Sequence, residues 1–397
     1  MRLRQIPTSI HRRGLLGLVV LSLVTSLFVP AAPAQTGTEK PVDYVIFKNG
    51  DKLTGTLERG VGTDIIFKSD VVGEVTISMD KVQELHSQGS FVVIKKDEKI
   101  ARTTKQPGNM TFSDGTVTVN DTKAGPETVP VTNLGYIIDK STFTKEVTEN
   151  PGFFHGWNGA VTGGLTVLEA TSYGQTFTAG INLIRAVPSV AYLPARTRTT
   201  FNLLETYGKL TQPVVPQTIP RSPDSVAKTN IFHTDFEHDK YLTDRFYLLG
   251  NVIYDHNYSQ GLDFQQIYGF GAGYTVLKDA IQTLDFKGDI HYERQNFVQY
   301  PPPAISSPNQ DLIGSTFAED YKRILPAKIA LTQGAVYIQS WNNLHAYSAI
   351  GSFGLVFPVY HRFGFNVNLL DTYLNNPAFG YQKNSLQFIT GVTYTLH

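Results

Sequence analysis

From residue 157 onward the chain alternates apolar and polar residues, and residues 281–294 show this most clearly. One parity of this stretch is apolar and the other ionisable: Leu284, Phe286, Ile290 and Tyr292 against Asp285, Lys287, Asp289, His291 and Glu293. Successive side chains of a β-strand point to opposite faces. The stretch is therefore predicted to be a strand with one apolar face and one charged face.

The alternation recurs about twelve times, in strands of roughly ten or more residues, which is long enough to cross a bilayer when tilted. The predicted strands are residues 157–168, 175–185, 196–210, 229–239, 245–256, 265–277, 281–295, 312–324, 327–341, 345–357, 362–373 and 385–396. We therefore predict an all-β fold with an antiparallel transmembrane β-barrel. A large soluble sandwich would have similar faces, but the aromatic residues gather near the strand ends, as they do at membrane interfaces.

The connections between these strands alternate in length. Short turns follow the fourth, sixth, eighth and tenth strands, and longer loops follow the third, fifth, seventh and eleventh. This alternation is expected when one rim faces the periplasm and the other faces outside. It predicts both barrel ends and the N-terminal region on the periplasmic side. Two connections do not fit this alternation. Residues 186–195 form a long connection where a short turn is expected, and Asn342-Asn343 form a short one where a long loop is expected.

Three predicted strands alternate poorly: residues 196–210, 312–324 and 327–341. In the first of them, Glu205 falls on the apolar parity. An extra residue in one strand shifts the facing of every residue after it. We therefore expect a bulge or a change of register in these strands.

The polar parity predicts which side chains line the lumen. The candidates are His233, Asp235, Glu237, Asn251, Asp255, Asp285, Lys287, Asp289, His291, Glu293, Asp320 and Lys322. They form an acidic sector with a few bases, and strand four adds Asp239. Such a sector favours one of two interpretations: a path for cations, or a salt-bridged filling of a narrow lumen that does not conduct.

The N-terminus has the features of a secretory signal. Arginines precede an apolar run at residues 14–29, and Ala32-Pro33-Ala34 matches an A-x-A cleavage site. The run is shorter than the roughly 20 residues of a spanning helix, which disfavours an uncleaved anchor. We therefore predict a signal peptide at residues 1–34.

Residues 42–139 contain shorter strands separated by turns. Asn49-Gly50 marks a hairpin in the first half, and a weaker echo of the same strand spacing begins at Phe91. This predicts a small SH3-like or Sm-like β unit, either duplicated as residues 42–88 and 90–139 or formed as one larger domain from both halves. Residues 140–156 read as a linker to the barrel at 157–397.

Composition narrows the functions. The formal net charge is zero, so no basic surface for nucleic acid is indicated. Only 17% of residues are charged, below the roughly 25% of soluble domains. With no cysteine there is no disulfide or thiolate chemistry. We expect no cofactor.

Two alternative functions, lipid hydrolysis and metal binding, are considered because the chain contains the serine and histidine residues that they would use. Some twelve-stranded barrels are lipid hydrolases, which need a serine beside an oriented histidine. His345 and Ser348 are three residues apart in one strand, so their side chains point to opposite faces. Metal binding would use His233, His238, His256 and His291, but their spacing is not that of a tight ligand set. We therefore expect no enzyme and no metal site.

Three stretches carry a family resemblance: P-G-F-F-H-G-W-N-G-A-V-T-G-G-L at 151–165, D-R-F-Y-L-L-G-N-V-I-Y-D-H-N-Y-S-Q-G-L-D-F-Q-Q-I-Y-G-F-G-A-G-Y at 244–274, and V-I-F-K-N-G-D-K-L-T-G-T-L at 45–57. They resemble the salt-induced outer-membrane protein family of bacteria, whose barrel has no assigned function. The resemblance implies an outer-membrane barrel without a named ligand. The expected partners are outer-membrane lipid, the barrel assembly machinery, and a periplasmic protein or the cell wall.

Overall fold

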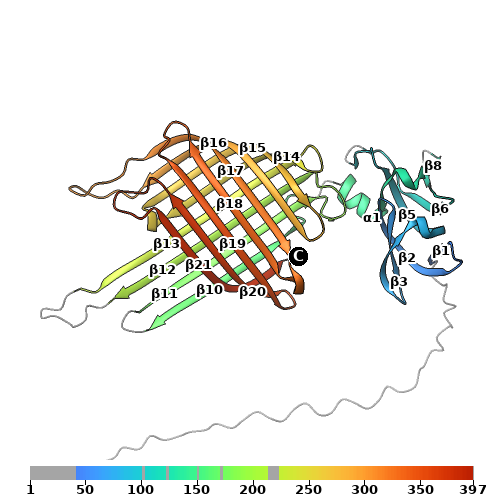
Figure 1. Cartoon of the computed structure of the whole chain (residues 1–397), viewed down its shortest axis with the longest axis horizontal. Helices are drawn as coiled ribbons and strands as arrows, with labels where there is room; N and C mark the ends of the chain where they lie inside the picture. The colour runs from blue at the N-terminus through green and yellow to red at the C-terminus, as the bar shows by residue number, and fades with distance from the viewer. Residues whose placement is uncertain are drawn as a thin grey trace, which may run out of the picture. The chain divides into compact units, whose positions relative to one another are not determined.

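The structure is a computed structural model that describes residues 42–100, 103–121, 125–149, 152–169, 173–212 and 223–396. The predicted signal peptide at 1–34 lies outside these residues and stays a prediction. The described chain forms an N-terminal β-sheet followed by a closed β-barrel (Figure 1). None of its helices is both long and apolar enough to cross a bilayer.

Twelve antiparallel strands close the barrel, which confirms the predicted fold class. In ring order they are β10 (Trp157–Glu169), β11 (Tyr173–Val187), β12 (Thr197–Gln212), β13 (Ser225–Tyr241), β14 (Phe246–Asn257), β15 (Leu262–Lys278), β16 (Gln282–Phe297), β17 (Gln310–Ile324), β18 (Ala330–Ser340), β19 (Tyr347–Tyr360), β20 (Phe363–Leu374) and β21 (Asn384–Leu396). Closure leaves no free sheet edge except where the first and last strands meet.

The barrel has two rims that differ in their connections. We call the rim where β10 starts and β21 ends the terminal rim; the short turns after β13, β15, β17 and β19 lie there, with η6 (Pro326–Lys328) in the third. The opposite, distal rim has the long connections 298–309 and 375–383 and also η5 (Tyr258–Gln260). The alternation in loop length holds only in part, because the terminal rim also has the nine-residue connection 188–196, and the distal connection 258–261 has four residues.

The bulges predicted for the third, eighth and ninth strands are not found there. The ladders that join β12 to β13 and β17 to β18 run without a break in register. Shifts occur instead between β14 and β15, β15 and β16, and β19 and β20. The poor alternation came from residue type alone, because Glu205 simply occupies the outward parity, opposite Ala179 and Phe232.

The N-terminal strands form one nine-stranded sheet. They are β1 (Asp43–Phe47), β2 (Lys52–Val61), β3 (Asp64–Ser69), β4 (Gly73–Ser78), β5 (Val82–Lys95), β6 (Gly108–Ser113), β7 (Thr116–Asp121), β8 (Gly125–Pro130) and β9 (Leu134–Asp139), with short helical turns η1 (Met79–Lys81) and η3 (Val131–Asn133). β5 pairs with β1, β6 and β9, so it belongs to both predicted halves.

A single core unites these halves. Val45 and Phe67 from the first half and Met110, Phe112 and Ile137 from the second are buried in one hydrophobic cluster. A duplication as units at 42–88 and 90–139 stays a prediction, but these residues share one sheet and one core. The reason is the length of β5, which carries the ladder past the predicted boundary.

The predicted linker is partly helical and explains the long connection at 186–195. After β9 the chain forms α1 (Lys140–Thr142) and a π-helical turn, η4 (Phe143–Thr148). Leu193 of the connection is buried with Ile94, Ile138 and Phe143. The carboxylate of Glu146 accepts hydrogen bonds from the Ser189 backbone N–H and hydroxyl, at 2.6 and 2.7 Å. The connection is long because it supplies this packing.

Candidate functional site

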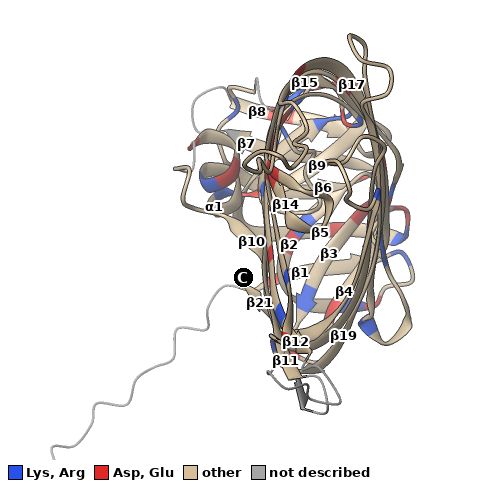
Figure 2. Cartoon of the chain, turned by 90° about the vertical axis from the view of Figure 1, so that its left-hand side faces the viewer, with Lys and Arg blue, Asp and Glu red and all other residues tan. Residues whose placement is uncertain are grey.

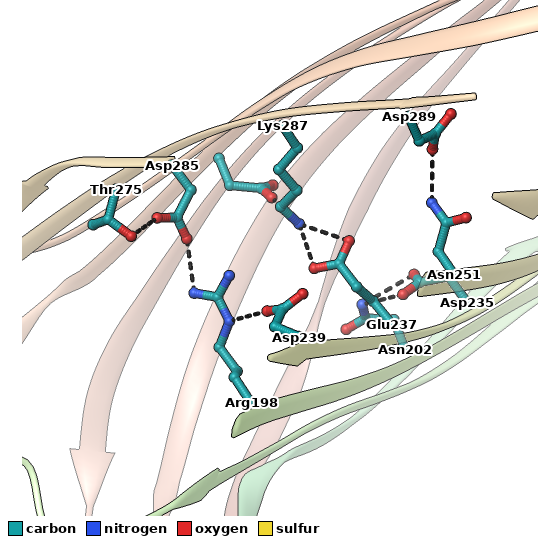
Figure 3. A network of polar contacts seen from close by, with 11 residues as sticks. Arg198, Asn202, Asp235, Glu237, Asp239, Asn251, Thr275, Asp285, Lys287 and Asp289 are labelled. Carbon is teal, nitrogen blue, oxygen red and sulfur yellow. Dashed lines mark hydrogen bonds and ion pairs between the residues drawn. The ribbon is translucent and has the colours of Figure 1, made fainter. Parts of the chain in front are cut away.

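Ion pairs reach across the inside of the barrel (Figure 3). Arg198 of β12 donates from Nε to Asp239 Oδ2 at 2.6 Å and from Nη1 to Asp285 Oδ2 at 2.7 Å. β12 and β16 are not neighbours in the ring, so their side chains meet only through the interior. We call the parity that makes such contacts the interior face. The Arg198 guanidinium also lies over the ring of Tyr247, 5.0 Å from its centroid.

A second crossing joins β13, β16 and β17. Lys287 Nζ lies 2.8 Å from Glu237 Oε1 and 2.8 Å from Asp320 Oδ2. Glu237 is buried, and Lys287 is nearly so. A buried charge is costly unless it is paired and hydrogen-bonded, and this lysine pairs with both carboxylates.

Further toward the distal rim, His233 lies between two carboxylates. Its Nδ1 is 2.6 Å from Asp255 Oδ1, and its Nε2 is 3.2 Å from Asp235 Oδ1. The amide of Asn202 also donates to Asp235, at 2.9 and 3.0 Å. With a carboxylate at each ring nitrogen, the imidazole can hold both acids by hydrogen bonds.

On β16 the polar side chains continue as a buried row. Asp289 accepts from the Asn251 amide at 2.9 Å and lies 2.9 Å from His291 Nδ1. Glu293 accepts from the amides of Gln265 and Gln295. Hydrogen bonds of this kind satisfy buried carboxylates without a cation.

Glycines of β15 make room for these side chains. A Cβ at Gly269 would lie 2.1 Å from Asn251 Oδ1, and one at Gly273 would lie 2.3 Å from the Tyr247 ring. Both glycines are on the interior parity, between β14 and β16. The glycine alternation at 269–273 is thus a packing device for the charged neighbours.

We call the interior face of β12–β17 the charged wall. Eight carboxylates lie on it with four lysine and arginine side chains: Asp235, Glu237, Asp239, Asp255, Asp285, Asp289, Glu293 and Asp320 with Arg198, Lys278, Lys287 and Lys322. All twelve residues singled out from the sequence lie on this parity, and the structure joins most of them by contacts. Whether they line a solute path remains a prediction.

Sequence reasoning missed the side chains that complete the charged wall. Arg198, Asn202 and Thr275 were not singled out, although Thr275 donates to Asp285 at 2.5 Å. Arg198 and Asn202 share the parity of Thr200 and Thr206, which is the polar one of β12. Glu205 on the opposite parity obscured that signal.

The rest of the ring has a different interior. β18–β21, β10 and β11 place no charged residue on the interior parity among the residues described. They place small, amide and aliphatic side chains there, such as Ser348, Gly354, Asn366, Gln387, Thr393, Ile338, Leu370 and Ile389. We call this the uncharged wall. Figure 2 colours Lys and Arg blue and Asp and Glu red, and long stretches of the barrel ribbon carry neither colour.

The distal mouth is covered by loops from opposite sides of the ring. Gln260 of η5, between β14 and β15, is 1% exposed and donates to the carbonyls of Thr372 and Lys383, at 3.0 and 2.7 Å. The Gln260 carbonyl accepts from the backbone N–H of Ala378 at 3.1 Å. β14–β15 and β20–β21 lie six strands apart, so these bonds span the mouth.

Apolar packing completes this distal cover. Leu262, Phe297, Leu374 and Ala378 form one buried cluster, from the distal ends of β15, β16 and β20 and the loop after β20. Gly261 has φ +67°, and a Cβ there would lie 2.3 Å from that of Ala378. The cover therefore depends on a glycine in the left-handed region and on close contact.

Most of the histidines considered for hydrolysis or metal binding contact other groups in the described structure. His345 and Ser348 share no hydrogen bond there, and no cluster of three or more potential ligands is arranged around a metal. The four histidines are used separately: His238 contacts Thr199, and His256 contacts the carbonyl of Asp263.

An ionic cluster in the N-terminal sheet resembles the charged wall on a smaller scale. Lys105 Nζ lies 2.8 Å from Glu98 and 3.0 Å from Glu127. Partial burial raises the pKa of Glu98, but hydrogen bonds from Lys105 and Thr103 outweigh it and lower that pKa below its usual value. The pKa of Glu127 is lowered in the same way by Lys95 and Lys105. The cluster ties β5 and β8 to the segment between β5 and β6.

Residues 175–396 match a family described as "Protein of unknown function, DUF481". No curated protein matches. Among solved structures, the chain is similar to the NanC porin (8% identity, 60% of this chain, 100% of that chain, TM-score 0.33). It is also similar to the translocator domain of the autotransporter NalP from Neisseria meningitidis (12%, 60%, 87%, 0.30) and an outer membrane channel from Pseudomonas putida F1 (11%, 62%, 100%, 0.32).

Proposed function

The chain belongs to the DUF481 family, whose function is unknown, and we propose that it is a bacterial outer-membrane β-barrel with a closed interior. In this proposal the protein binds a partner or anchors its N-terminal sheet at the membrane, and it does not conduct ions. The outward parity supports a bilayer location, because Phe270, Phe286, Phe317, Phe365 and Phe388 are exposed. Tyrosines gather toward the distal end of this face, where Tyr254 contacts Tyr268, and Tyr347 contacts Tyr337 and Tyr373. Aromatic girdles of this kind mark membrane interfaces.

The observation that carries the closed interior is the Arg198 crossing from β12 to β16. An open cation path needs carboxylates that are free to meet the ion. Here Asp239 and Asp285 are engaged by Arg198, and Glu237 by Lys287. At the distal rim, the bonds of Gln260 close the mouth as well.

In this proposal the terminal rim faces the periplasm, so that the N-terminal sheet is a periplasmic docking unit. The reason is topological, because a secreted chain with an even number of strands returns to the side on which it entered. The sheet would bind a periplasmic protein or the cell wall, while the barrel holds it at the membrane.

A second candidate, passage of small cations, is favoured by the excess of carboxylates over bases on the charged wall. Planar-bilayer recording of the refolded protein separates the two. We expect no sustained conductance from the natural chain. A steady, cation-selective current that falls in Asp285→Asn/Asp289→Asn/Glu293→Gln would overturn the closed interior.

A further inference from the structure

A hollow lies on the outer face of the barrel at the terminal rim. Its volume is about 450 Å³, and it is lined by Tyr360, His361, Arg362, Phe363 and Tyr394. Sites for small ligands typically have volumes of about 300–1,000 Å³. We call this site the rim hollow.

Three neighbouring strands hold the walls of the rim hollow. Phe363, at the start of β20, pairs with Tyr360 of β19 on one side and with Tyr394 of β21 on the other. The ring centroids of Phe363 and Tyr394 lie 5.0 Å apart. The backbone N–H of Thr395 donates to the carbonyl of Arg362 at 2.9 Å. The rim hollow is therefore built on paired strands and a turn that is tied to them.

The turn between β19 and β20 consists of His361 and Arg362. His361 has φ +47°, a left-handed conformation that is uncommon for residues other than glycine. Its ring packs edge-on against Tyr360, with the ring centroids 4.1 Å apart. Backbone conformations of this kind cost free energy and gather at ligand sites. The turn brings an imidazole and a guanidinium group to the rim hollow.

The Arg362 side chain makes no hydrogen bond or ion pair with any described residue. No acidic residue of the described chain lines the rim hollow. Another arginine at the same rim is engaged, because Arg245 Nη1 donates to the carbonyl of Val276 at 2.7 Å. The fork of N–H donors on a guanidinium group matches the oxygens of a phosphate. Arg362 is thus available to an anion.

The surroundings of the rim hollow favour a lipid. Phe365 and Val392 pair with each other next along the outer face, and they are 44% and 56% exposed. Aromatic rings near strand ends mark the membrane interface. A phosphate on Arg362 would lie at that interface, with apolar chains beside Phe365 and Val392. A head group that also carries an ammonium would be repelled by Arg362 and would meet no carboxylate.

We propose that the rim hollow binds the head group of an anionic phospholipid, with Arg362 donating to its phosphate. The aromatic rings of the hollow lie beside its glycerol, and Phe365 and Val392 lie beside its acyl chains. The proposal rests on the membrane location proposed above and adds to it a site and a lipid class.

Binding is tested with the full-length protein in phosphatidylcholine nanodiscs. Val359, next to the rim hollow and 72% exposed, is replaced in Val359→Cys and labelled with a fluorophore, since the chain has no other cysteine. Phosphatidylglycerol with brominated acyl chains quenches the fluorophore on contact. We expect half-maximal quenching at a mole fraction about tenfold lower than for brominated phosphatidylcholine, which corresponds to about 1.4 kcal/mol.

Two variants in the labelled chain locate the site. Arg362→Gln, at an exposed turn, should abolish the preference for phosphatidylglycerol and leave quenching by phosphatidylcholine unchanged. Arg245→Gln is the matched control and should keep the preference, because that arginine already bonds a carbonyl. Soluble glycerol phosphate should not displace the brominated lipid, because it lacks the acyl chains.

Four results would overturn the proposal: equal quenching by the two lipids, an unchanged preference in Arg362→Gln, the same loss in Arg245→Gln, or displacement by glycerol phosphate. The last result would assign the rim hollow to a soluble phosphate. Insertion into nanodiscs is scored separately by protease protection. A protein that inserts without a lipid preference contradicts the rim hollow alone, whereas a protein that fails to insert contradicts the membrane location as well.

Discussion

The charged wall and the uncharged wall belong to one barrel but differ in the interactions of their interior side chains. On β12–β17, long ionisable side chains reach inward and are held by each other, by amides and by room at glycines. On β18–β21, β10 and β11, uncharged side chains line the interior, and the amides of Asn366 and Gln387 have no hydrogen-bond partner in the described structure. The difference teaches that the parity of a strand predicts which face is polar but not how that face is held: one wall is tied together by ion pairs, and the other has no charged side chain among the described residues.

The largest effect is expected from Arg198→Ala, which leaves Asp239 and Asp285 without their cation. Removing one partner of a buried pair typically costs 3–5 kcal/mol. Urea unfolding followed by gel mobility should show that loss. Neutralising the acids as well, in Arg198→Met/Asp239→Asn/Asp285→Asn, should recover most of it. If Arg198→Ala proves as stable as the natural chain, the charged wall is not held by this crossing.

Adding a side chain at Gly273, against the Tyr247 ring, should have the next largest effect on the stability of the barrel. Gly273→Val forces the ring or the strand to move, and overpacking of this kind costs about 1–3 kcal/mol. Gly351→Ala is the control, because a Cβ there meets no atom within 4 Å. Unfolding midpoints of the two variants compare the sites. Equal midpoints would show that β15 glycines are not needed by the charged wall.

The distal cover should loosen in Gln260→Ala, which removes the side-chain bonds to Thr372 and Lys383. Hydrogen exchange of residues 375–383 should become faster, with little change in strands β14 and β20. A typical hydrogen bond contributes about 0.5–1.5 kcal/mol, so the change should be local. Unchanged exchange would mean that the apolar cluster alone closes the mouth.

The smallest effect is expected from a change of pH on the stability of the N-terminal sheet. Its cluster of Lys105, Glu98 and Glu127 is partly exposed to solvent and serves as a comparison for the charged wall. Because folding lowers the pKa of Glu98 and Glu127, their stabilisation is present above the unfolded pKa and lost as pH falls through the folded pKa. The protection of β5 and β8 amides against hydrogen exchange, after correction for the intrinsic exchange rate at each pH, should therefore fall on acidification below the usual glutamate pKa. Glu98→Gln/Glu127→Gln should flatten this dependence, by about 0.5–1 kcal/mol per ion pair, since the groups are partly exposed. A dependence that survives in this variant must come from other groups.

The sequence predicted the barrel and the parity of its charged residues because a strand converts a period of two directly into two faces. Ile281 to Arg294 behaves as that rule requires, with Asp285, Lys287 and Asp289 making interior contacts. It did not predict Arg198, because Glu205 on the other parity hid the alternation. Nor could it predict the Gln260 cover, since this cover depends on residues far apart in the chain that meet only after closure.

The central claim, a barrel closed from the distal side, is tested most directly by labelling one interior cysteine. Ser352 lies on the interior parity opposite Gly334, and the chain has no other cysteine to react. A membrane-impermeant maleimide added to intact cells should leave Ser352→Cys unlabelled. The same reagent should label it in Ser352→Cys/Gln260→Ala if the cover opens, and in permeabilised cells. Rapid labelling of the single variant in intact cells would contradict the closed interior.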